Sequence, residues 1–112
     1  MISEQKHLAL CDEFMLCLDE QRFYDAHEAL EEIWFPRRFD DDGEVKLLKG
    51  FINASVSFEL AKKGKVSASN KVWKNYLKYR QLFYKVDSKY LNKYNSILRS
   101  IDRTRSCKPY LE

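Results

Sequence analysis

The chain has 112 residues, enough for one domain with a core of its own. Its composition, 45% hydrophobic and 33% charged, is typical of a globular protein and excludes a disordered one. No apolar run approaches the roughly 20 residues that a membrane-spanning helix needs, so we expect no membrane segment. The first residues lack the features of a signal peptide, and the three cysteines lack C-x-x-C spacing, which together favour a cytoplasmic protein with free thiols.

Charge is divided unevenly along the chain. Residues 1–64 carry 8 Lys and Arg against 14 Asp and Glu, a net charge of −6, whereas residues 65–112 carry 12 against 3, a net charge of +9. Such polarity can steer an acidic partner to the C-terminal half. We favour the simpler interpretation that the two halves attract each other, or a second copy in a homodimer.

The apolar spacing is helical throughout the chain, and no stretch alternates as a strand does. The first predicted helix begins after Ser3, its N-cap, and runs to about Glu20. Its apolar stripe consists of Leu8, Cys11, Phe14, Met15 and Leu18. A short second helix is predicted after it, capped by Asp25 and ended by Pro36, because the residue before a proline is pushed out of the helical region.

Three further helices are predicted after an acidic loop. The third spans residues 43–63 and ends at Gly64, the fourth spans residues 67–84, and the fifth begins after a cap at Asp87 or Ser88. Short loops make successive helices antiparallel neighbours. We therefore predict an all-α fold, a compact single-domain bundle of about five helices, mostly antiparallel and up-and-down, over residues 1–104, with a flexible tail over residues 105–112.

The second helix carries the most informative residues. On a wheel of about 100° per residue, His27 lies at the edge of the apolar arc near Trp34, and Glu31 lies one step further round. His27 and Glu31 are neighbours at i and i+4, so the carboxylate can hold one imidazole nitrogen and leave the other for a ligand, a metal or a substrate. The alternative is a buried polar network that fixes the register of the helices.

Glu59 is the second unusual residue, because it lies inside the apolar arc of the third helix. A carboxylate there must find a partner or become protonated. If the second and third helices pack antiparallel, His27 and Glu59 approach each other. We predict a cluster of His27, Glu31 and Glu59, joined by Arg80 from the fourth helix.

A metal site formed by His27, Glu31 and Glu59 is less favoured, and we expect no cofactor. Carboxylate-bridged helix bundles carry two Glu-x-x-His motifs, and this chain has only one histidine nearby. The zinc protease motif also needs a second histidine where Glu31 stands.

The segment FYDAHEALEEIW, residues 23–34, resembles the domain-of-unknown-function family 309, a group of small all-helical proteins. It is followed at the expected distance by LLKGFINA, residues 47–54, and KGK, residues 63–65. The resemblance implies a helical bundle with His27, Glu31 and Trp34 at its characteristic site. It implies no reaction.

The leading interpretation is a binding domain whose polar pocket takes up a small molecule or a protein partner. The predicted binding residues are His27, Glu31, Trp34, Glu59 and Arg80. The alternative is a hydrolase-like enzyme, with or without a metal, in which His27 is the general base and Glu31 orients it. A third interpretation is a nucleic-acid-binding module, because residues 71–105 interleave basic and aromatic side chains. It is not favoured, because the aromatic residues lie mostly at core spacing.

Overall fold

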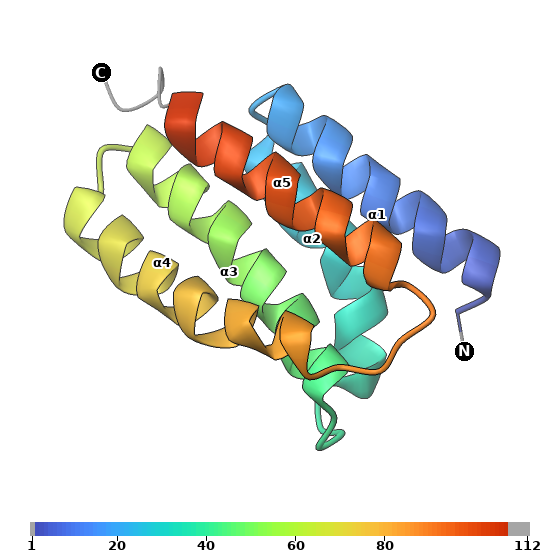
Figure 1. Ribbon diagram of the computed structural model, residues 1–112. Helices are drawn as coiled ribbons and strands as arrows, with labels where there is room; N and C mark the ends of the chain where they lie inside the picture. The colour runs from blue at the N-terminus through green and yellow to red at the C-terminus, as the bar shows by residue number, and fades with distance from the viewer. Residues whose placement is uncertain (1, 108–112) are drawn as a thin grey trace.

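The computed structural model describes residues 2–107, which fold into helices without a strand (Figure 1). The elements are α1 (Glu4–Asp19), α2 (Phe23–Trp34), the 3-10 helix η1 (Phe35–Arg37), α3 (Gly43–Lys62), α4 (Val66–Arg80), the 3-10 helix η2 (Gln81–Tyr84) and α5 (Leu91–Cys107). The predicted all-α single-domain bundle is thus confirmed.

The helices form two hairpins, and α5 packs against both of them. α1 pairs with α2 and α3 pairs with α4, while α2 packs against α3 and joins the two hairpins. α5 then packs on α1 and α3, and Figure 1 shows it running between them along much the same direction. As a result, the start of α1, the end of α2 with η1, the start of α3 and the start of α5 all lie at one end of the bundle.

The helix ends follow from local chemistry. The Ser3 hydroxyl accepts a hydrogen bond from the Lys6 backbone N–H at 3.1 Å and so caps α1. A carboxylate oxygen of Asp42 accepts from the Glu44 backbone N–H at 2.8 Å and caps α3. Gly64 follows α3 with a φ of 80°, the left-handed conformation that favours glycine after a helix.

Several predicted helix boundaries differ from the structure. α2 ends at Trp34 as an α-helix, but Phe35 keeps helical angles, φ −56° and ψ −46°, so Pro36 does not push the preceding residue out of the helical region, and the chain continues into η1. α4 ends at Arg80, and α5 begins at Leu91 rather than directly after Asp87 or Ser88.

Two further differences lie at the start of α2 and at the end of α5. α2 begins at Phe23 with Arg22 as its N-cap residue, so Asp25 lies in the first turn and makes an ion pair with Arg22 at 2.9 Å instead of capping the helix. α5 continues through Cys107, whereas we expected the tail to begin at Arg105. The guanidinium of Arg105 lies 4.4 Å from the centre of the Trp73 ring, which explains the extra turn. The rest of the predicted tail, residues 108–112, lies outside the described residues.

The core contains one continuous apolar cluster to which α1 to α5 contribute. Its largest fully buried side chains are Tyr76, Tyr94, Phe14, Phe23, Phe51, Phe58, Leu18, Leu30, Leu47, Leu48, Ile52 and Ile97. Cys11 and Cys17 are buried in it as free thiols, as expected. Among the helices of the described chain, none is long and apolar enough to cross a membrane.

Some of the basic side chains of the C-terminal half form ion pairs with acidic side chains of the N-terminal half. Lys89 pairs with Glu4 at 3.2 Å, and Lys93 pairs with Asp12 at 2.7 Å. Both ion pairs join the basic C-terminal half to the acidic α1. They favour the interpretation that the two halves attract each other.

α3 and α4 approach each other closely at Gly50. A β-carbon built on Gly50 would lie only 2.7 Å from Cβ of Tyr79, which is attached directly to the backbone of α4. The missing side chain therefore sets the distance between these two helices.

We predict that Gly50→Ala lowers the free energy of unfolding by about 1–2 kcal/mol, because α4 must move away although alanine favours a helix more than glycine does. Urea unfolding measures the change. Gly43→Ala is the control, since a β-carbon there would meet only Val86 at an ordinary 3.9 Å. Equal stability of the two variants would show that helix spacing does not depend on Gly50.

Candidate functional site

The predicted His27–Glu31 pair forms on α2. The His27 Nε2 atom lies 2.8 Å from Oε2 of Glu31, and the two side chains are 24% and 35% exposed. The His27 ring also meets the edge of the Tyr24 ring, at 5.7 Å between centres. The pair is therefore local to one helix and open to solvent rather than buried in the core.

The other predicted site residues have partners elsewhere. Trp34 packs against the core and is covered by the Lys49 ammonium, 4.2 Å from the ring centre. The Glu59 carboxylate pairs with Lys63 one helical turn away, at 3.3 Å. Arg80 lies 4.0 Å from a carboxylate oxygen of Asp102 on α5.

The structure thus joins His27 to Glu31, but within residues 2–107 no hydrogen bond or ion pair links either of them to Glu59 or Arg80. The same part of the chain holds no group of three His, Cys, Asp or Glu side chains suited to a metal ion. A binding role for the five predicted residues stays a prediction.

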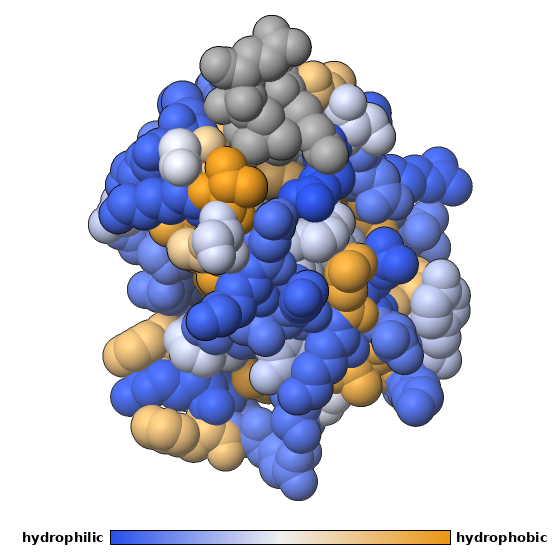
Figure 2. Space-filling view, turned by 90° about the vertical axis from the view of Figure 1, so that its left-hand side faces the viewer, coloured by the Kyte–Doolittle hydropathy of each residue, from blue (hydrophilic) through white to orange (hydrophobic). Residues whose placement is uncertain are grey.

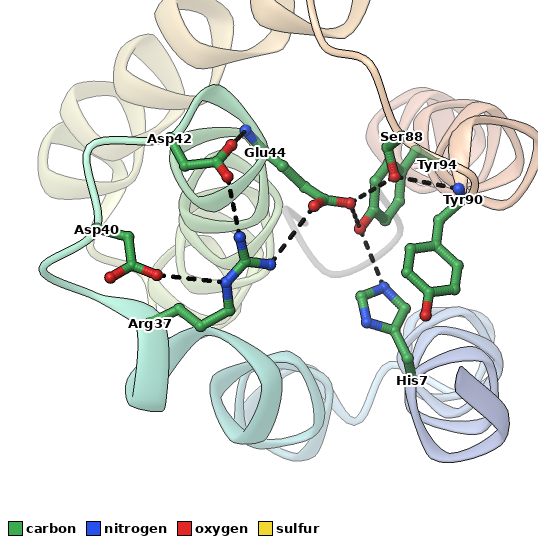
Figure 3. Close-up of polar contacts among 8 residues, drawn as sticks. All are labelled: His7, Arg37, Asp40, Asp42, Glu44, Ser88, Tyr90 and Tyr94. Atoms are coloured by element: carbon green, nitrogen blue, oxygen red, sulfur yellow. Dashed lines mark hydrogen bonds and ion pairs between the residues drawn. The ribbon is translucent and has the colours of Figure 1, made fainter. Parts of the chain in front are cut away.

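A more extensive polar arrangement lies at the end of the bundle where four segments meet (Figure 3). At its centre is the carboxylate of Glu44, in the first turn of α3, which is only 14% exposed. Its Oε2 atom accepts hydrogen bonds from the hydroxyls of Ser88, at 2.5 Å, and Tyr94, at 2.7 Å. Its Oε1 atom accepts from Arg37 at 3.4 Å. We call this arrangement, completed by His7, the Glu44 network.

Arg37 connects the network to the acidic loop before α3. Its guanidinium pairs with Asp42 at 3.0 Å and with Asp40 at 3.6 Å, besides Glu44. Burial disfavours the charged guanidinium, but the neighbouring carboxylates outweigh it and the pKa of Arg37 is raised. Arg37 is therefore a fixed positive charge held by three carboxylates.

His7 is a buried titratable side chain of the network. The residue is 5% exposed, its Nε2 atom lies 3.0 Å from the Tyr94 hydroxyl, and its ring stacks on Tyr90 at 3.7 Å. Burial lowers the pKa of His7, and the cations Arg37 and Lys89 act in the same direction against the opposing effect of Glu44. His7 is thus favoured in its neutral form.

The network borders an open cavity of about 730 Å³, which lies within the size range of small-molecule sites. We call it the His7 cavity. Its lining residues are Ile2, Glu4, His7, Ile33, Pro36, Arg37, Asp40, Lys89 and Tyr90. The cavity therefore combines apolar wall residues, an aromatic pair and charges of both signs.

Comparison with known families identifies the chain. A family model described as a domain of unknown function, DUF309, matches residues 11–72, more than half of the sequence. The chain belongs to the DUF309 family. The resemblance seen in the sequence is thereby confirmed. No curated protein and no solved structure matches the chain.

The DUF309 match covers only part of the Glu44 network. Arg37 and Glu44 lie within residues 11–72, whereas His7 and Tyr94 lie outside them. The His27–Glu31 pair lies wholly inside the matched segment. The Glu44 network in this DUF309 chain therefore combines matched residues with residues from both sides of the match.

Sequence reasoning missed His7, although a signal was present. His7 shares a helix face with the buried Leu10, Cys11 and Phe14, at i+3, i+4 and i+7. A histidine on such a face needs a polar partner inside the protein. The partner, Tyr94, is 87 residues away in the chain, and periodicity alone cannot reveal it.

We predict that Tyr94→Phe lowers the free energy of unfolding by about 1–3 kcal/mol, because it leaves buried groups of His7 and Glu44 without their hydrogen-bond partner. Tyr76→Phe is the matched control. The Tyr76 hydroxyl is buried, and among the described residues it has only a weak contact with Arg80 and no hydrogen bond of ordinary geometry, so its removal should cost much less than removal of the Tyr94 hydroxyl. Urea unfolding of both variants tests this, and equal losses would contradict the role given to Tyr94.

We also predict that His7 makes stability depend on pH. Because its pKa is lowered in the folded state from an ordinary value of 6.5, the unfolded chain binds more protons as the solution is acidified. The contribution of His7 is complete above pH 6.5 and is lost as the pH falls through the lower folded value. Melting temperatures between pH 7.5 and pH 5 should fall more steeply in the wild type than in His7→Asn. Parallel curves would refute the prediction.

Proposed function

We propose that this DUF309 domain is a binding module for a small molecule, and that the ligand occupies the His7 cavity. The observation that carries the proposal is the cavity itself, about 730 Å³ in volume and bordered by a buried histidine and a fixed arginine. Small-molecule sites are typically concave and largely apolar, with a few placed polar groups. The His7 cavity has apolar and aromatic walls, and four of its nine lining residues are charged.

The Glu44 network supports the proposal because it fixes the polar wall in advance. His7 is held by Tyr94 and Tyr90, and Arg37 is held by three carboxylates. A ligand that meets side chains already in position loses less free energy to their ordering. The His27–Glu31 pair, in contrast, lines neither the His7 cavity nor the shallow acidic hollow between α1 and α2.

A library of small planar compounds tests the proposal by thermal shift and by amide chemical-shift changes. We expect compounds that perturb amides around the His7 cavity and lose affinity at least about fivefold in Ile2→Trp, whose ring occupies part of the cavity. Leu16→Trp is the control, because Leu16 is exposed on α1 and does not line the cavity.

His27→Ala separates the two candidate sites. We expect it to leave binding in the His7 cavity unchanged. Compounds that bind the wild type and Ile2→Trp equally, but not His27→Ala, would place the ligand on α2. Turnover of a substrate that disappears with His27→Ala would instead support the hydrolase-like alternative, with Glu31 orienting the base.

A second candidate function, nucleic-acid binding, is favoured by one observation on α4. Residues 60–86 contain eight Lys and Arg and no Asp or Glu. Lys71, Lys74, Lys78 and Lys85 are exposed, and none of them makes an ion pair with another described residue. Figure 2 views the molecule from the side on which α4 lies and shows a largely hydrophilic surface there. Unpaired lysines of this kind can neutralise phosphates.

Binding of a single-stranded oligonucleotide, followed by fluorescence anisotropy, tests this second function. We expect affinity to fall steeply with salt concentration and the double variant Lys74→Glu/Lys78→Glu to bind at least about tenfold more weakly. Lys46→Glu is the control, because Lys46 already pairs with Asp41 on the acidic side. Absence of binding at low salt, or an equal loss in the control, would reject the function.

A further inference from the structure

The hydrogen bonds of the Glu44 network fix where the protons lie. Tyr94 has one hydroxyl proton and donates it to Glu44 at 2.7 Å. Burial and the hydrogen bond to Glu44 raise the pKa of Tyr94 far above its ordinary value, so this proton stays in place. In the 3.0 Å contact between Tyr94 and His7, the tyrosine oxygen must therefore accept, and Nε2 of His7 must donate.

This donation determines the state of the other ring nitrogen. A neutral imidazole carries a single N–H, so a proton on Nε2 leaves Nδ1 with a free lone pair. Nδ1 makes no hydrogen bond to any residue in the described range 2–107, and His7 lines the cavity. Figure 3 shows Nδ1 on the side of the ring that faces Arg37 across the site.

We propose that His7 presents Nδ1 to the cavity as a fixed hydrogen-bond acceptor, and that the site recognises ligands carrying an N–H or O–H donor on a flat apolar body. This inference rests on the proposed small-molecule function and names its ligand class. Ser88, Tyr94 and Glu44 are positioning residues. Ser88 and Tyr94 orient the Glu44 carboxylate, and Tyr94 orients the imidazole ring of His7.

The remaining walls of the cavity agree with this class of ligand. Ile2, Ile33 and Pro36 offer apolar contact, and the ring of Tyr90, which stacks on one face of His7, adds a second aromatic ring to the wall. The Glu4 carboxylate is already paired with Lys89, and the carboxylate of Asp40 lies 3.6 Å from Arg37. These charges are engaged with each other, whereas Nδ1 of His7 makes no hydrogen bond to another residue in the range 2–107, and neither does the hydroxyl of Tyr90.

The tautomer is tested directly by long-range 1H–15N spectra of the full chain at pH 8, with His27→Gln used to assign the two histidines. We expect His7 to show a protonated Nε2 and an unprotonated Nδ1. Tyr94→Phe should shift both signals toward the average of two exchanging tautomers, while Tyr76→Phe should leave them unchanged. A protonated Nδ1 in the wild type would overturn the proposal.

Ligand recognition is tested with indole and 1-methylindole, which differ in the presence of an N–H donor. We expect indole to perturb Nδ1 of His7 and to bind about tenfold more tightly than 1-methylindole, the effect of one hydrogen bond. Equal binding of the two probes in the cavity would overturn donor recognition and leave the proposed function standing. If neither these probes nor any library compound binds there, the proposed function itself fails, whatever the tautomer of His7.

Discussion

The burial of one carboxylate, that of Glu44, is the constraint on which this end of the molecule depends. A carboxylate that is only 14% exposed must be satisfied by hydrogen bonds or by charge. Its partners come from η1 through Arg37, from the turn before α5 through Ser88, and from α5 through Tyr94. Through Tyr94 it also reaches His7 on α1. One carboxylate thereby connects η1, the turn before α5, α5 and α1 by directional hydrogen bonds, which the apolar core does not provide.

The same constraint produces a site. Because Glu44 holds the hydroxyl of Tyr94, the ring of His7 is held in one orientation beside the cavity, and Arg37 is fixed opposite it. Side chains fixed in this way suit selective binding, since the polar groups are positioned before a ligand arrives. The His27–Glu31 pair is not held by a hydrogen bond from another helix in this way, because both partners of its hydrogen bond lie on α2.

Charge is used differently in two parts of the basic half. Lys89, in the turn before α5, and Lys93, on α5, form ion pairs with α1 and help to hold α5 against it. On α4, the exposed Lys71, Lys74 and Lys78 have no acidic neighbour within residues 60–86. Basic side chains therefore have a structural role at α5, whereas these lysines of α4 remain without an ion pair among the described residues.

The sequence by itself determined the helices and one local pair. The Ser3 cap and the turn at Gly64 depend on neighbouring residues, and the contact between His27 and Glu31 follows from the i, i+4 geometry of a helix. Only the tertiary structure decided the Glu44 network and its cavity, because its hydrogen bonds join side chains up to 87 residues apart in the chain. Periodicity shows which face of a helix is buried, but the packing of all five helices decides which polar groups meet there.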